Sequence, residues 1–313
     1  MLGPQLTSYP PLRNTTKLRL ILSHIWLIIF KTYGGEIMIK VFYRKEMVAE
    51  TKSFSPSPSK PERVVSSWLS KFQSIEVVEP EPVTVDQLCL VHDRKYVEGV
   101  LSCELKNGFS NRDEAVAKSL PYTSGAMLGA AREALKNGKV AIAPCSGFHH
   151  ARWDKAFGYC TFNGLMVTAQ VLKQENAITR IGIIDFDMHE GDGTDNIIDH
   201  LGIDWIVHFS AGYKYHTPGQ AVEFLDAIPD ITCMMAGCDL VLYQAGADPH
   251  VDDPLGGFLT TQQLKSRDWR VFEMLSTLKI PVAWNLAGGY QGDFSRVLEI
   301  HDSTMEACLA VYG

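Results

Sequence analysis

The sequence predicts an α/β protein: a single three-layer αβα domain in which helices cover both faces of a mainly parallel central sheet. Two observations support this prediction. From Met38 to the C-terminus, short apolar segments of strand length alternate with segments of helical periodicity. No internal repeat or linker interrupts this alternation, which is typical of parallel sheets with helices on both faces. We therefore expect one domain at residues 38–313.

The first element after Met38 with a clear signature is a loop. Residues 53–62 (SFSPSPSKPE) predict an irregular loop, because their three prolines disfavour helix and central strand. Residues 124–138 are rich in small side chains, which predicts a tightly packed helix that ends at Gly138.

The remaining elements alternate between strands and helices. Apolar runs of strand length predict buried strands at residues 139–144, 180–187, 204–210, 239–246 and 281–288. Helical patterns lie at residues 164–174, 261–278 and 295–311.

The first 37 residues form an N-terminal extension that differs from the rest. Residues 20–30 are strongly apolar but too short for a membrane helix, which needs roughly 20 residues to cross ~30 Å. No small-residue cleavage motif follows them. Residues 34–36 (GGE) would be encoded by a purine-rich tract that resembles a bacterial ribosome-binding site ahead of Met38. Our hypothesis is that residues 1–37 are untranslated or disordered and that the protein is bacterial.

Charge and cysteine content exclude several classes of protein. The formal net charge is -7 and no long basic run occurs, which argues against a nucleic-acid partner. The seven cysteines are scattered and none forms a CxxC pair. This pattern indicates reduced thiols in a cytoplasmic protein without a membrane span, and neither a disulfide framework nor a cysteine zinc site.

Polar side chains follow four of the expected strands. In chain order they are His149 and His150, then Asp185, Asp187, His189 and Asp192, then Asp248, and finally Tyr290. Ligands of open parallel sheets bind outside the carboxyl ends of the strands. The sequence therefore predicts a functional site at this edge of the sheet.

These residue types permit metal-assisted hydrolysis. Two aspartates and a histidine suit Zn²⁺ or Fe²⁺ and leave coordination positions open for water and substrate. A metal-bound water is a usable nucleophile near neutral pH. Adjacent histidines can transfer protons, and a tyrosine hydroxyl can donate to a carbonyl oxygen. Amides and esters are the substrates that such a set would hydrolyse.

Four stretches resemble the histone deacetylase superfamily, which includes acetylpolyamine amidohydrolases and acetoin-utilisation proteins. They are residues 147–163 (GFHHARWDKAFGYCTFN), 185–194 (DFDMHEGDGT), 246–257 (GADPHVDDPLGG) and 287–290 (AGGY), in the order of the family. The resemblance implies an arginase/deacetylase-like fold with its active site at the C-terminal ends of the strands. It also implies zinc-dependent removal of an acyl group, expected to be acetyl, from a lysine side chain or a small alkylamine.

The resemblance further implies a metal site and a substrate channel. Asp187, His189 and Asp248 would bind the metal, which is Zn²⁺ or alternatively Fe²⁺. Gly158 and Tyr159 would line the channel that admits the acylated chain.

It also implies a catalytic set. His149 and His150 would be the tandem acid/base pair, oriented by Asp185 and Asp192 respectively. Tyr290 would polarise the acyl carbonyl. Which of the two histidines is the general base is left open at this point.

A structural potassium ion and some departures from the family complete the resemblance. Asp185 and nearby carbonyls would hold K⁺, together with Ser210. Most members have a histidine or another neutral residue where this chain has Glu190, which we expect to face away from the metal. Residues 287–290 read AGGY and not GGGY, and residues 53–62 lack the His-Pro pattern of many members. Substrate recognition is the property that these departures put in doubt.

The same residues are compatible with other functions. Each polar residue has a structural alternative, such as a turn role for Asp248 or a helix cap for Asp187. An arginase-type ureohydrolase is disfavoured, because Gly191 stands where a second-metal ligand would be needed. A catalytically silent acylamine-binding protein of the same fold is the alternative that remains. The sequence leaves the acyl group, the amine and the oligomeric state open.

Overall fold

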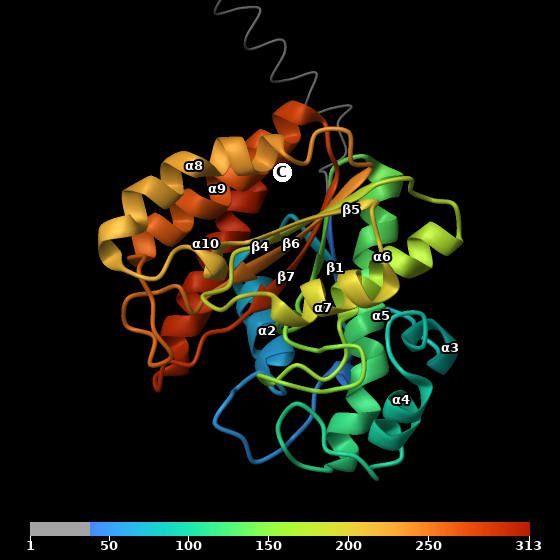
Figure 1. Cartoon of the computed structure of the whole chain (residues 1–313). Coiled ribbons are helices and arrows are strands. Elements are labelled where there is room, and N and C mark those ends of the chain that lie inside the picture. Colours follow the sequence, from blue (N-terminus) through green and yellow to red (C-terminus); the bar gives the residue numbers. More distant parts are fainter. Residues whose placement is uncertain (1–37) are drawn as a thin grey trace, which may run out of the picture. The chain divides into compact units, whose positions relative to one another are not determined.

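A parallel β-sheet lies at the centre of residues 38–313, the part of the chain that the computed structural model describes (Figure 1). Its seven strands are β1 (Ile39–Phe42), β2 (Ile75–Val78), β3 (Val140–Ala143), β4 (Ile181–Asp185), β5 (Ile206–Ser210), β6 (Leu240–Gly246) and β7 (Val282–Ala287). Their order across the sheet is β2-β1-β3-β7-β6-β4-β5, and every strand pair in this part of the chain is parallel. The predicted α/β class with a mainly parallel sheet is confirmed.

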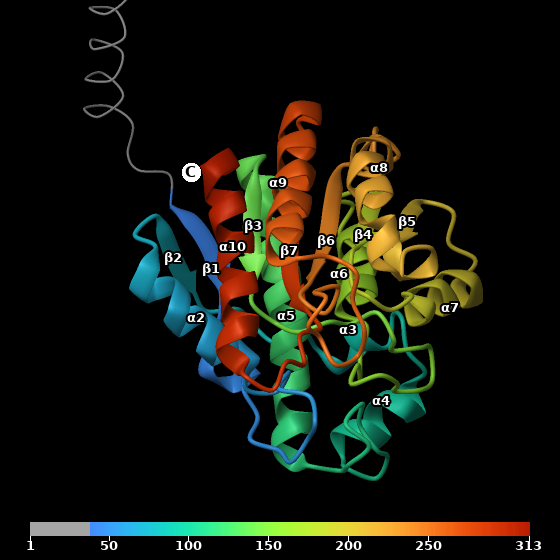
Figure 2. The ribbon, with the colours of Figure 1, turned by 90° about the vertical axis from the view of Figure 1, so that its left-hand side faces the viewer.

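Helices cover both faces of the sheet (Figures 1 and 2). One layer consists of α2 (Lys60–Lys71), α8 (Ala221–Cys233), α9 (Thr261–Leu278) and α10 (Phe294–Tyr312). The opposite layer consists of α3 (Val85–Leu88), α4 (Arg94–Leu101), α5 (Glu114–Asn137), α6 (Gly164–Gln174) and α7 (Asp192–Leu201). Short 3₁₀ helices occur at η1 (Lys45–Met47), η2 (Ala211–Tyr213) and η3 (Pro218–Gln220).

Each face of the sheet has its own hydrophobic core. Along β6, Leu240 and Leu242 point into the core beneath α5 and α6, while Val241 and Tyr243 point into the core beneath α8, α9 and α10. Successive side chains of a strand face opposite sides, so the continuously apolar strands are those buried on both faces. These two cores hold the carboxyl ends of the central strands in place.

Two helices occupy residues where the sequence did not predict helix: α2 was not predicted at all, and α5 begins before the predicted range of residues 124–138. α2 starts at Lys60, inside the predicted loop at residues 53–62, and Pro61 occupies its first turn. Proline is compatible with that position, because the first N–H groups of a helix have no partner within the helix. α5 starts at Glu114 and contains Pro121. Buried side chains in its first turns, Val116 among them, stabilise a helix that the proline alone would disfavour.

The N-terminal hypotheses lie outside the described residues, and this applies to the apolar run at residues 20–30 and to the extension at residues 1–37. Residues Met38–Gly313 form a single compact unit. Among the helices of residues 38–313, none is long and apolar enough to cross a membrane.

Replacing a core leucine tests the two-core arrangement. Leu242 is fully buried, so Leu242→Ala should lower the free energy of unfolding by about 2–5 kcal/mol, the usual cost of a large cavity. Leu69 on α2 is 56% exposed, and Leu69→Ala should change it by about 0.5 kcal/mol or less. Urea denaturation followed by circular dichroism measures both. Equal effects of the two substitutions would contradict the assigned core.

Candidate active site

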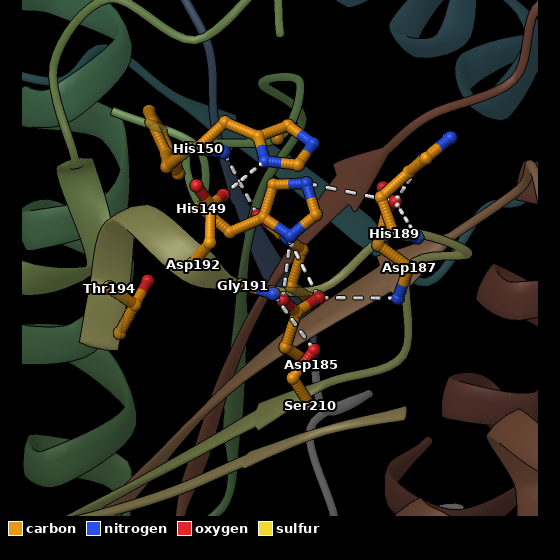
Figure 3. Close-up of polar contacts among 12 residues, drawn as sticks. His149, His150, Asp185, Asp187, His189, Gly191, Asp192, Thr194 and Ser210 are labelled. Atoms are coloured by element: carbon orange, nitrogen blue, oxygen red, sulfur yellow. Dashed lines mark hydrogen bonds and ion pairs between the residues drawn. The ribbon is translucent and has the colours of Figure 1, made fainter. Parts of the chain in front are cut away.

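The predicted polar residues lie at one edge of the sheet. β3, β7, β6 and β4 are consecutive neighbours in the sheet, and all four run in the same direction. Their carboxyl ends therefore meet, and the loops that follow them bring side chains from distant parts of the sequence together. Figure 3 shows His149, His150, Asp185, Asp187 and His189 gathered at this edge.

The two adjacent histidines each bind an aspartate through Nδ1. His149 Nδ1 lies 2.7 Å from Asp185 Oδ2, and His150 Nδ1 lies 2.6 Å from Asp192 Oδ1 (Figure 3). The centroids of the two rings are 4.1 Å apart. An aspartate bonded at Nδ1 fixes the orientation of the ring and leaves Nε2 for other partners.

The surroundings shift the pKa values of the two histidines in opposite directions. Burial alone would lower the pKa of His149, but the carboxylates of Asp185 and Asp187 outweigh it and raise this pKa to about 9. Burial lowers the pKa of His150, and the neighbouring His149 lowers it further. Environments that separate the pKa values of paired groups are characteristic of functional sites.

A third cluster, formed by Asp187, His189 and Asp248, has the geometry of a metal site. One ligand atom from each residue lies within 4.8 Å of the others. His189 Nδ1 is 3.1 Å from Asp187 Oδ1 and 3.1 Å from Asp248 Oδ2. Both carboxylates are buried, whereas the side chain of His189 is 35% exposed. Oxygen and nitrogen ligands that converge beside an accessible face suit a divalent cation with open positions.

The charges of this cluster favour a bound cation. Burial and the nearby charge of Asp187 raise the pKa of Asp248 to about 7. Hydrogen bonds to Asp187 and Asp248 raise the pKa of His189 to about 11. Two buried carboxylates repel each other, and a divalent cation between them would relieve this repulsion. The residues present therefore fit a metal ion.

Tyr290 lies over the site, within a frame of aromatic side chains. Its backbone N–H donates to Asp253 Oδ2 at 2.8 Å, which holds the end of the turn after β7. The ring of Phe54 stacks on the Tyr290 ring with centroids 6.2 Å apart, and the Tyr159 ring lies 5.7 Å away. A narrow pocket beneath them is lined by His149, Asp187, Gly158, Tyr159 and Tyr290, with five further residues.

Gly158 and Tyr159 have an unusual backbone. Both lie in the left-handed region, with φ of 52° and 63°. A Cβ on Gly158 would be 2.3 Å from His150 Cδ2, so no larger residue fits against that ring. For a non-glycine residue a positive φ is uncommon, and strained residues of this kind concentrate at functional sites. The structure thus brings the two predicted channel residues next to the histidine pair.

The surroundings of Asp185 are filled with hydrogen bonds. Asp185 Oδ1 accepts from Gln244 Nε2 at 2.8 Å, and Oδ2 faces His149. Ser210, which pairs with Asp185 in the sheet register, accepts a hydrogen bond from the Gly191 N–H at 2.9 Å. Glu190 is not part of the metal-type cluster found among residues 38–313.

Three contacts were not expected from the sequence. Arg152 Nε lies 3.1 Å from Asp192 Oδ2, so an arginine supports the aspartate that binds His150. Gln244 supports Asp185, as described above, and a polar residue inside the apolar run of β6 was the available signal. His208 Nδ1 pairs with Asp195 Oδ1 at 2.6 Å.

The sequence is similar to those of known proteins. An uncharacterised protein of Picosynechococcus sp. is 29% identical over 268 residues, which cover 75% of this chain and 88% of that protein. The acetoin utilization protein AcuC of Staphylococcus aureus is 34% identical over 134 residues, which cover 38% of this chain and 34% of AcuC. The chain thus matches only about a third of AcuC.

Solved structures have the same fold. The HDA15 HD domain superposes with a TM-score of 0.72 at 19% identity, covering 86% of this chain and 90% of that one. The acetylpolyamine aminohydrolase from Burkholderia pseudomallei superposes with a TM-score of 0.70 at 17% identity, covering 88% and 100%.

A family match covers the first half of the candidate site. Residues 57–218 match the histone deacetylase domain family, and this range includes both histidine–aspartate pairs, Asp187 and His189. Asp248 and Tyr290 lie beyond it and reach the site through the fold. The resemblance seen in the four sequence stretches is confirmed, and the chain belongs to the histone deacetylase family.

Proposed function

We propose that residues 38–313 are the catalytic domain of a metal-dependent amidohydrolase that removes an acyl group, acetyl in the first instance, from a lysine side chain or a small alkylamine. One observation carries the proposal above all others. Two histidines, each bonded to an aspartate, lie at the same edge of the sheet as the Asp187–His189–Asp248 cluster. Membership of the histone deacetylase family supports this reaction type.

Asp187, His189 and Asp248 would hold the metal. Zn²⁺ is our first choice, and Fe²⁺ is compatible with the same ligands. A bound metal would polarise the acyl carbonyl and lower the pKa of a coordinated water. The Met188 N–H donates to Asp248 Oδ1 and the His189 N–H donates to Asp187 Oδ1, so the backbone holds both carboxylates in the cluster, which supports this assignment.

His149 and His150 would move the protons of the reaction. Amide hydrolysis adds water to the carbonyl carbon and breaks the C–N bond, so one proton must leave the water and one must reach the departing amine. Nε2 of each ring is the atom available for this, because Nδ1 is bound to Asp185 or Asp192. The aspartates stabilise whichever ring carries the extra proton.

Tyr290 would stabilise the negative charge that develops on the carbonyl oxygen. Burial raises the pKa of Tyr290 above its ordinary value, so its hydroxyl stays protonated and can donate a hydrogen bond. The N–H···Oδ2 bond to Asp253 holds the residue in place before substrate arrives. Preorganised donors of this kind do not have to reorient during the reaction.

The aromatic mouth of the pocket supports a slender substrate. The Phe54 ring stacks on the Tyr290 ring, and the Tyr159 ring is tilted against Tyr290, an aromatic surface that suits an unbranched alkyl chain leading to an acylamine. Gly158 keeps the wall beside His150 free of a side chain. We therefore infer that acylated lysine or an acylated small amine is the substrate.

Two further assignments belong to this proposal. A structural potassium ion would bind near Asp185 and Ser210, where carboxylate and hydroxyl oxygens lie close to the sheet edge. A cytoplasmic location is supported by the cysteines, all of which are free in the structure.

The proposed reaction predicts turnover that depends on His150. The zinc-loaded protein should hydrolyse a fluorogenic acetyl-lysine substrate or acetylated polyamines. His150→Ala should lower kcat/KM by about 10²–10⁴-fold, the usual contribution of a general acid or base. His216→Ala is the matched control, because His216 is exposed and outside the site.

Two results would count against this assignment. An inert wild-type protein across all acylamines would reject the activity, and ligand binding without product would favour the silent acylamine-binding alternative. Equal turnover by wild type and His150→Ala would remove His150 from the mechanism.

The metal assignment predicts different effects of two neighbouring carboxylates. Asp187→Asn should abolish zinc binding, because it removes a charged ligand from the cluster. Glu190→Gln should leave zinc binding nearly intact, because Glu190 is outside the cluster. Zinc content after dialysis measures both. A loss of zinc from Glu190→Gln as large as from Asp187→Asn would show that the ligand set is wrong.

A further inference from the structure

A fully buried arginine lies behind the metal cluster. Arg267 of α9 has no exposed surface, although arginine is almost never fully buried without partners. A buried guanidinium is stable only where hydrogen bonds and a counter-charge satisfy it. Its partners therefore show what the residue does in this fold.

The guanidinium joins the ends of two strands. Arg267 Nη1 donates to the carbonyl oxygen of Phe186 at 3.0 Å and to that of Gly246 at 2.7 Å. Phe186 directly precedes Asp187, and Gly246 lies two residues before Asp248. One nitrogen thus contacts the backbone beside each carboxylate of the metal cluster.

These contacts occur just beyond the last hydrogen bonds between strands β4 and β6. The last residue pair of the β4–β6 ladder is Asp185 with Gln244, and one hydrogen bond follows it, from the Phe186 N–H to the Gln244 carbonyl at 3.0 Å. Beyond this bond the segments that follow β4 and β6 are still very close, since a Cβ on Gly246 would lie 2.6 Å from Asp187 Cα. Arg267 supplies the cross-link that the ladder no longer provides.

The charge of Arg267 is compensated away from the metal cluster. Arg267 Nε binds Asp268 Oδ1 at 2.8 Å, and Asp268 also accepts hydrogen bonds from the hydroxyls of Tyr243 and Thr304. Among the described residues, Arg267 makes no hydrogen bond to the carboxylates of Asp187 or Asp248. The ligand oxygens therefore remain available to a cation while their backbone is held from behind.

We propose that Arg267 is a positioning residue for the metal centre. By binding the carbonyls of Phe186 and Gly246, it sets the separation of Asp187 and Asp248 and so preorganises the site for a divalent cation. This inference rests on the metal centre of the proposed function. Residues that orient metal ligands typically contribute about 10–100-fold to metal affinity.

The test compares zinc affinity among folded variants. In Arg267→Met/Asp268→Asn the charge pair is removed as a unit, and the asparagine oxygen can still accept from Tyr243. We expect its zinc affinity to fall by about 10–100-fold. Tyr243→Phe is the matched control, because it disturbs the same buried network and leaves both Arg267–carbonyl bonds in place. Competition with a chromophoric chelator measures affinity, at a temperature where circular dichroism shows every variant folded.

The outcomes separate this inference from the proposed function. A zinc affinity close to that of the wild type in the folded double variant would overturn the role of Arg267. The role would also be overturned if Tyr243→Phe lost zinc affinity in proportion to its loss of stability. A wild-type protein that binds neither Zn²⁺ nor Fe²⁺ would overturn the metal centre itself. If the double variant does not fold, Arg267→Lys replaces it, since lysine keeps the charge and lacks the planar fork. Weaker zinc binding by Arg267→Lys than by Tyr243→Phe supports the proposal, and equal binding overturns it.

Discussion

Two buried carboxylates, Asp187 and Asp248, lie side by side at the carboxyl edge of the sheet, and the construction of the site follows from this constraint. Taking such charges out of water costs several kcal/mol each unless hydrogen bonds and opposite charges compensate. Backbone N–H groups of His189 and Met188 donate to the two carboxylates, and the His189 ring lies between them. A divalent cation would complete this compensation, which is why we propose a metal at this cluster.

The parallel sheet explains how these charges can be brought together at all. Four consecutive strands of the sheet end at the same edge, so short loops after them are enough to bring their side chains together. The helices of the two layers cover both faces of the sheet (Figure 2). Support comes from the core side of the site, where Gln244 donates to Asp185 and Arg267 donates to the backbone beside the proposed metal ligands. Ligands, histidines and supporting residues thus form successive shells that extend into the core.

The residues of the site indicate the type of reaction more specifically than the fold does. Folds of this kind carry more than one reaction, so the reaction type rests on the histidine pairs, the metal cluster and Tyr290. The entrance of the pocket has an aromatic contact that the sequence did not predict. Phe54, from the loop before α2, stacks on Tyr290. If the proposed function is correct, substrate preference is expected to depend on this aromatic contact more than on the proposed catalytic residues.

By itself, the sequence determined the class of fold and most of the candidate site. Hydrophobic periodicity is a local property, so the five strands from β3 to β7 and the helices α6, α9 and α10 could be recognised from neighbouring residues alone, whereas α7 and α8 were not predicted. The polar residues after each strand could be recognised as well, because the carboxyl ends of parallel strands share one edge. The histidine and aspartate partners followed from the family resemblance, and their distances are those of hydrogen bonds.

Only the tertiary structure decided which strands are neighbours, where α2 and α5 begin, and which polar residues support the site. Lys60 and Arg267 belong to ordinary polar stretches of sequence, yet both are fully buried and donate to backbone carbonyls near the metal cluster. Their roles depend on residues far away along the chain, such as Gly288 for Lys60. The burial of a charged side chain is set by what packs around it, and no local pattern contains that information.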